Sequence, residues 1–276
     1  MPAPRVIPHS DGAGIIEAVG PGVSAARIGE RVWVFRADSG RKGGGTAADL
    51  AVVPSCHAIR LPDITSFDIG ACLGVPAITA HAAVFLDGPV TGQTLLIQGG
   101  AGAVSQYAIQ LARWNGARVI TTVSSDDKAD LAVRLGADAV VNYRKEDVVS
   151  RVRAFAGADG VDRIVEVDFG ANLAIDHEII RENGKIASYS STKDPDPKLP
   201  YYAFARKGVT LHFVQGKNLP EGARAAAARD ITVLMERDLL RHPELRLFPL
   251  EETVAAHQLL ESSAFAGKVL VSVSEA

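Results

Sequence analysis

The pattern of apolar and polar positions divides the chain into three stretches, and the first is rich in short strands. Its β-branched runs are separated by Gly, Pro, Asp and Ser, which is typical of strands joined by turns. The runs are Gly14–Gly20, Glu30–Arg36 and Ala48–Pro54. From Phe67 to Val84, small apolar residues recur at helical spacing. We therefore predict an antiparallel barrel or sandwich, followed by a helix that connects two domains.

The second stretch alternates regularly between apolar runs and amphipathic segments. The apolar runs predict strands at Leu95–Gln98, Arg118–Val123, Ala139–Asn142, Val161–Val167, Lys185–Ser188 and Val209–Val214. The segments between the first four runs predict helices at Val104–Trp114, at Asp127–Leu135 and from about Lys145 to Phe155. Strands that alternate with helices in this way form a doubly wound parallel sheet. This stretch therefore predicts a Rossmann domain.

The third stretch contains two amphipathic helices and a last strand. The helices are expected at Ala225–Leu240 and Glu251–Leu260, and the strand at Lys268–Val273. A β-rich start that reappears as one strand at the end indicates a discontinuous domain. The predicted fold class is α/β, with residues 1–90 and 243–276 in a β-rich domain and residues 91–242 in the Rossmann domain.

A glycine-rich turn lies at the centre of this organisation, between the strand that begins near Thr94 and the helix that ends before Gly116. Its spacing is Gly100-x-Gly102-x-x-Ser105, in which a serine replaces the third glycine of the dinucleotide fingerprint. Such a turn presents backbone N–H groups and the positive end of a helix dipole to a pyrophosphate. The alternative is an ordinary tight turn between a strand and a helix. The repeated strand–helix context favours the dinucleotide site.

The end of the second Rossmann strand indicates which dinucleotide is bound. Sites that prefer NAD usually place an acid there to hold the ribose 2′-hydroxyl. Here the strand leads into Ser124 and Ser125, and Lys128 follows in the first turn of the next helix. Hydroxyl donors and a cation suit a 2′-phosphate, so NADPH is favoured over NADH. Two alternatives stay open: the serines cap the helix, or a shift in register brings Asp126 or Asp127 to the ribose.

Composition and charge restrict the function further. The chain of 276 residues has a net charge of −3 with acids and bases interspersed, which gives no reason to expect nucleic-acid binding. Cys56 and Cys72 are too few for a disulfide framework or a four-cysteine zinc lobe, and they are expected as reduced thiols in the cytoplasm. The first residues contain no apolar signal core, and no stretch is expected to span a membrane.

Seven stretches carry a resemblance to a known family, in that family's order. They are His9–Val23, Gly29–Val34, Gly45–Pro54, Gly70–Val84, Gln98–Arg113, Ser124–Tyr143 and Phe248–Val271. The arrangement resembles the zinc-independent quinone oxidoreductases of the zeta-crystallin type, in the medium-chain dehydrogenase/reductase superfamily. The resemblance implies a GroES-like domain beside the Rossmann domain, NADPH as cofactor, and a homodimer paired through an edge strand at Val209–Val214. Because members usually carry roughly fifty further residues ahead of this start, it also implies a GroES-like domain truncated at its N-terminus.

The resemblance further implies roles for individual residues. Thr79 is expected near the nicotinamide ring, and the pyrophosphate is expected along Gly100, Ala101, Gly102, Ala103 and Val104. The 2′-phosphate is expected among Ser124, Lys128 and Tyr143, with Ser125 beside them. The nicotinamide half is expected to be bordered by Phe169, Ser190, Phe213 and Gln215.

The local histidine and cysteine supply argues against a metal. Zinc-dependent relatives carry Gly-His-Glu where this chain has His9-Ser10-Asp11, so Ser10 replaces their ligand histidine. A catalytic zinc needs three well-placed protein ligands, and no metal is expected here. The leading function is therefore hydride transfer from NADPH to a quinone or a related α,β-unsaturated carbonyl compound. The alternatives are a non-catalytic NADPH-binding sensor or structural relative and, among enzymes, an enoyl or alkenal reductase.

Overall fold

The chain folds into two units. The computed structural model describes residues 5–39, 44–262, 264–265 and 267–273. Unit 1 comprises Met1–Ile78 and Arg224–Ala276, and unit 2 comprises Thr79–Ala223. The boundaries fall inside two helices, α1 (Phe67–Phe85) and α7 (Glu221–Glu236), whereas the sequence analysis placed them after residues 90 and 242. A helix that runs from one unit into the next has no break in its apolar pattern to mark the boundary.

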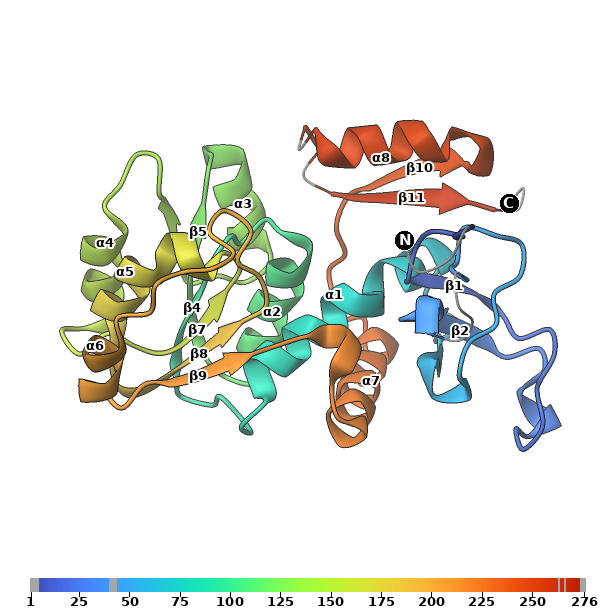
Figure 1. The fold of residues 1–276 in the computed structure, drawn as a ribbon, viewed down its shortest axis with the longest axis horizontal. Coiled ribbons are helices and arrows are strands. Elements are labelled where there is room, and N and C mark those ends of the chain that lie inside the picture. Colours follow the sequence, from blue (N-terminus) through green and yellow to red (C-terminus); the bar gives the residue numbers. More distant parts are fainter. Residues whose placement is uncertain (1–4, 40–43, 263, 266, 274–276) are drawn as a thin grey trace. The chain divides into compact units, whose positions relative to one another are not determined.

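Unit 2 is built on a six-stranded parallel sheet with the order β6-β5-β4-β7-β8-β9 (Figure 1). Its strands are β4 (Thr94–Ile97), β5 (Arg118–Val123), β6 (Ala139–Asn142), β7 (Val161–Glu166), β8 (Ile180–Ser188) and β9 (Thr210–Phe213). Its helices beyond α1 are α2 (Ala103–Trp114), α3 (Asp126–Arg134), α4 (Val148–Ala156), α5 (Phe169–Ile179) and α6 (Tyr201–Arg206). Helices cover both faces of the sheet, so the predicted doubly wound Rossmann sheet is confirmed.

Continuous apolar runs form the central strands because both faces of the sheet are covered. Leu95, Leu96 and Ile97 of β4 are all fully buried. Two glycines with positive φ end the helices of the first two crossovers: Gly116 (81°) follows α2 and Gly136 (103°) follows α3. Each crossover helix is thereby stopped where the chain must turn back toward the sheet.

Unit 1 contains a three-stranded antiparallel sheet and a separate two-stranded parallel sheet. The first sheet is formed by β1 (Gly12–Ile15), β2 (Arg31–Val34) and β3 (Ala58–Arg60), and the second by β10 (Leu245–Pro249) and β11 (Lys268–Ser272). The helix α8 (Thr253–Glu261) lies between β10 and β11 in sequence. The antiparallel, β-rich start that the sequence indicates is therefore present, and β3 and β10 are strands that the sequence analysis did not predict.

One predicted strand of unit 1 is wrong, because residues Ala48–Pro54 adopt no regular secondary structure. The run has the β-branched composition of a strand but pairs with no neighbouring strand among the described residues. Leu50 and Val52 remain 70% and 69% exposed, and both line a cavity of about 1080 Å³ within unit 1. Strand composition alone does not make a strand when no partner supplies the hydrogen bonds.

The helix α1 is long and apolar enough to cross a bilayer by length and composition, and the sequence analysis did not expect such a segment. Two residues interrupt it: Gly74 has non-helical backbone angles and Pro76 removes a backbone donor. The 18-residue stretch of α1 that is apolar enough to span a bilayer is 67% buried within the protein. Each half of the kinked helix is shorter than the roughly 20 residues that a bilayer core requires, which favours a core helix.

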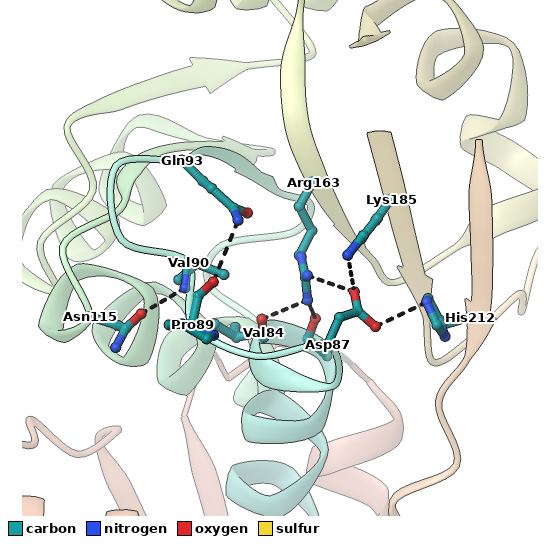
Figure 2. Close-up of polar contacts among 10 residues, drawn as sticks. Val84, Asp87, Pro89, Val90, Gln93, Asn115, Arg163, Lys185 and His212 are labelled. Carbon is teal, nitrogen blue, oxygen red and sulfur yellow. Dashed lines mark hydrogen bonds and ion pairs between the residues drawn. The ribbon is translucent and has the colours of Figure 1, made fainter. Parts of the chain in front are cut away.

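An ionic cluster around the buried Arg163 anchors the end of α1 to the sheet of unit 2 (Figure 2). Arg163 of β7 donates from Nη1 to the carbonyl oxygen of Val84 (2.6 Å) and from Nη2 to the Asp87 carboxylate (2.8 Å). Asp87 also contacts Lys185 of β8 (3.1 Å) and His212 of β9 (3.2 Å). Three neighbouring strands therefore meet at one carboxylate, directly after the last turn of α1.

Candidate nucleotide-binding site

The glycine-rich turn joins β4 to α2 and is held by backbone hydrogen bonds. Gly99 has a φ of 66°, a value that favours glycine. The N–H of Gly100 donates to the Thr122 carbonyl oxygen, and the N–H of Gly102 donates to the Gly99 carbonyl oxygen, both at 2.8 Å. Gly102 is the N-cap of α2 and provides no side-chain cap. The N–H groups of the first turn are therefore available to an anion.

The position of the third fingerprint glycine is occupied by a buried serine that fits the turn. Ser105 is fully buried, and its Oγ donates to the carbonyl oxygen of Gln98 at 2.8 Å. The same Oγ lies 3.1 Å from the hydroxyl oxygen of Tyr189. The hydroxyl thus hydrogen-bonds to the strand that it packs against, so the substitution of serine for glycine keeps α2 close to β4.

At the end of β5 the structure brings together the residues expected around a 2′-phosphate. Lys128 Nζ donates to Ser124 Oγ at 3.1 Å. Ser125 is the N-cap of α3, but its side chain makes no capping hydrogen bond. The N–H of Tyr143 donates to the carbonyl oxygen of Val123, and its side chain is 48% exposed. The missing side-chain hydrogen bond disfavours the alternative in which the serine side chain caps α3.

One of the two acids beside these residues, Asp126, is already paired. Asp126 accepts hydrogen bonds from Lys145 Nζ (2.6 Å) and from Asn142 Nδ2 (2.9 Å). These two hydrogen bonds and the charge of Lys145 hold the pKa of Asp126 below its usual range. Since its carboxylate is engaged by a neighbouring loop, Asp126 is a poor candidate for a ribose hydroxyl.

The residues expected at the nicotinamide half are brought together in part. The N–H of Phe169 donates to the Ser190 carbonyl oxygen (3.0 Å), and its buried ring makes an edge contact with Phe213 at a centroid distance of 6.3 Å. Gln215 is exposed just beyond β9, and Thr79 is buried in α1. The roles assigned to these residues by the resemblance stay predictions.

A buried polar network below the turn was missed by the sequence analysis. The Gln98 side chain accepts from Thr122 Oγ1 (2.8 Å) and donates to Asp176 Oδ1 (3.2 Å). Thr122 Oγ1 in turn accepts the N–H of Gly99 at 3.0 Å. The sequence contained one sign of this network: Gln98 follows the apolar strand β4, and a buried glutamine side chain needs hydrogen-bond partners.

The described residues contain no group of three or more His, Cys, Asp or Glu side chains placed to hold a metal ion. Unit 1 contains a histidine pair, in which His9 Nε2 and His257 Nε2 lie 2.9 Å apart. Two ligands are fewer than the three that a catalytic zinc takes from a protein.

Comparisons with known proteins support the two-part organisation. Residues 1–63 match the family described as alcohol dehydrogenase GroES-like domain, and residues 103–228 match the family described as zinc-binding dehydrogenase. The quinone oxidoreductase of Lama guanicoe is 31% identical over 270 residues, which cover 96% of this chain and 78% of the relative. The quinone oxidoreductase of Homo sapiens is 28% identical, with 96% and 79% covered. A mycobacterial protein solved in complex with NADPH is 27% identical with a TM-score of 0.83, and the match covers 95% of this chain and 81% of that one.

Proposed function

The chain belongs to the quinone oxidoreductase family of the medium-chain dehydrogenase/reductase superfamily. We propose that it is an NADPH-dependent reductase of quinones or related α,β-unsaturated carbonyl compounds and that it works without zinc. The observation that carries the proposal is the pairing of Lys128 with Ser124 at the end of β5. A cation and a hydroxyl at this point of a Rossmann sheet suit a 2′-phosphate.

The residues of unit 2 fit the cofactor in three ways. The first turn of α2 is uncapped and presents N–H groups to a pyrophosphate. The absence of a side chain at Gly100 lets the turn pack directly against Thr121, which a Cβ would approach to 2.3 Å. Lys128 supplies a positive charge where a phosphate would add a negative one.

When bound, the cofactor supplies the hydride, and the protein supplies position and electrostatics. A quinone that accepts one hydride and one proton becomes a hydroquinone, with the proton taken from water or a neighbouring group. Phe169 begins α5 just after β7, Ser190 follows β8, and Phe213 ends β9. Their expected task is to border and orient the ring that donates the hydride. Holding the two reactants in line supplies much of the rate by proximity.

The K128A substitution tests the choice of cofactor. We expect the Kd for NADPH to rise about 10- to 100-fold, because a hydrogen bond to a charged group contributes about 1.5–3 kcal/mol. The Kd for NADH should stay within about twofold, because NADH has no 2′-phosphate. Titration of nicotinamide fluorescence measures both, and R134A, an exposed cation at the far end of α3, is the matched control. An equal loss for both dinucleotides contradicts this role for Lys128.

Turnover separates the enzyme from a binding protein. The purified protein is mixed with NADPH, and nicotinamide absorbance is followed after addition of a small quinone or, in a parallel sample, a small enone. Oxidation by the quinone supports the reductase, and faster oxidation by the enone favours the enoyl or alkenal reductase alternative. Tight NADPH binding without oxidation by either acceptor overturns the catalytic proposal in favour of the sensor alternative.

We also propose that the chain forms a homodimer through β9, which is an edge strand of the sheet as the sequence predicted. β9 contains no proline, and Phe213 at its end is 76% exposed. An unprotected apolar edge tends to pair with another strand. Light scattering at micromolar concentration is expected to give the mass of two chains. A monodisperse species with the mass of one chain contradicts the dimer.

A further inference from the structure

Two acidic side chains are completely buried next to each other beneath the glycine-rich turn. Glu166 is the last residue of β7 and Asp176 lies in the third turn of α5, and both have a relative exposure of 0%. The charge of Glu166 acts directly on the carboxyl group of Asp176, so the two groups are neighbours in the buried network. Two ionised carboxylates in such a position would repel each other without solvent to screen them.

The hydrogen bonds to the two carboxyl groups leave one oxygen atom of each group without a donor in the described part of the chain. Glu166 Oε1 accepts from the N–H of Asp168 (2.5 Å) and from Asn172 Nδ2 (2.9 Å). Asp176 Oδ1 accepts from Gln98 Nε2 (3.2 Å). The remaining oxygens, Glu166 Oε2 and Asp176 Oδ2, have no donor among the described residues. One proton shared between these two atoms satisfies both of them.

The proton belongs to Asp176. Burial raises the pKa of Asp176 well above its ordinary value, and the charge of Glu166 raises it further. Burial also raises the pKa of Glu166, but this group accepts several N–H donors, which favour its ionised form. The other titratable group at the pair is the buried Tyr189 hydroxyl, and the Asp168 carboxylate next along the chain faces Lys193 at 3.8 Å. Asp176 is thus the donor and Glu166 the acceptor.

The pair connects the two turns that border the candidate site. On one side, Asp176 accepts a hydrogen bond from Gln98, and the Gln98 side chain accepts one from Thr122. Thr122 in turn accepts the N–H of Gly99 at the start of the glycine-rich turn. Through Glu166 the pair holds the N–H of Asp168, at the turn that leads into α5. The partners lie at or just beyond the ends of β4, β5 and β7, which are three neighbouring strands of the sheet.

We propose that protonated Asp176 and the Glu166 carboxylate are a positioning pair that holds the glycine-rich turn and the turn at 167–169 in the geometry that binds the dinucleotide. The dinucleotide part of this inference rests on the proposed function. The pair touches neither the cofactor nor the substrate. It acts through Gln98 on one side and through the backbone at Asp168 on the other.

The proton is tested by infrared spectroscopy of the full chain without cofactor. A buried protonated carboxyl group gives a carbonyl-stretch band that ionised carboxylates lack. We expect this band in the wild-type protein at neutral pH and its loss in D176N, whose amide keeps an acceptor for Gln98 and a donor for Glu166. Absence of the band from the wild type, or its persistence in D176N, overturns the assignment of the proton.

The positioning role is tested by hydrogen exchange of the same cofactor-free protein. In D176A, amides of residues 98–104 and 166–170 should exchange about tenfold faster than in the wild type, because buried partners lose their hydrogen bonds. D176N should exchange at rates close to the wild type. The control is D147A, which removes the N-cap of α4 in the same unit and should leave both segments unchanged. Equal protection in D176A and the wild type overturns the positioning role.

Dinucleotide affinity links the pair to the proposed function. D176A should weaken NADPH binding about tenfold while D176N stays within about twofold of the wild type. Wild-type NADPH affinity in D176A contradicts the inference. If the wild-type protein binds no dinucleotide, the proposed function fails, whereas the infrared and exchange measurements still decide whether the protonated pair holds the two turns.

Discussion

The D87A substitution is expected to lower the free energy of unfolding by about 3–5 kcal/mol, because it leaves a buried arginine without its anionic partner. The Arg163 side chain is only 3% exposed, and its remaining acceptors are backbone carbonyl oxygens at the end of α1 (Figure 2). Lys185, the other cation in contact with the carboxylate, loses its partner as well. The loss in the free energy of unfolding therefore comes from cations that are withdrawn from water without an anionic partner.

The charge state of Asp87 supports this expectation. Burial by itself raises the pKa of the carboxyl, but the hydrogen bond from Lys185 and the charges of Arg163 and His212 outweigh it and bring the pKa below its ordinary value. A carboxyl whose pKa is lower in the folded chain contributes stability above its unfolded pKa, and this contribution is lost as the pH falls through the folded value. The difference between wild type and D87A should therefore shrink in acid.

Urea denaturation measures the effect and provides its control. E178A removes an exposed acid from α5 that lies 3.9 Å from Arg153, and it should cost less than about 1 kcal/mol. D87N, which keeps a hydrogen-bonding group but removes the charge, should fall between the two. A loss of less than 1 kcal/mol in D87A would mean that Arg163 finds other partners, and the anchoring of α1 would have to be explained differently.

The Rossmann strands were predictable because their signal is local. A parallel strand covered on both faces is a short, mainly apolar run, and β4, β5 and β6 have this form. α5 was not predicted, because its buried positions include Asp176, and an acid at a buried position breaks the apolar period of a helix. The strand predicted at Ala48–Pro54 is wrong for the opposite reason: the run has strand composition, but no strand in the described part of the chain pairs with it.

The same contrast applies to the candidate site. Ser124 and Lys128 are four residues apart across the start of α3, so their contact is local in the sequence. Gln98 and Asp176 are separated by 78 positions, and no local pattern relates them. The parts of a Rossmann site that lie in one turn can be predicted from the sequence, whereas the polar network that joins several strand ends depends on the order of the strands.

The G100A substitution is expected to weaken NADPH binding about 100-fold, the loss that follows when a binding group is displaced by roughly 1 Å. A Cβ at this position would lie 2.3 Å from Thr121 Oγ1 and 2.9 Å from Thr121 Cγ2. Thr121 cannot easily yield, since it is fully buried and its hydroxyl donates to the carbonyl oxygen of Ile97 at 2.5 Å. The turn must therefore move, and its N–H groups move with it.

A double-mutant cycle identifies this clash as the cause. T121A removes the two closest atoms and leaves the Thr121 Cβ at 3.2 Å, so G100A combined with T121A should bind NADPH more tightly than the product of the two single effects requires. Titration of nicotinamide fluorescence measures all four proteins. G222A adds a Cβ to α7 where no atom lies within 4 Å, and it should bind like the wild type. Strictly multiplicative effects in the cycle would show that G100A weakens binding by a route other than contact with Thr121, because removing the clashing atoms would then restore nothing.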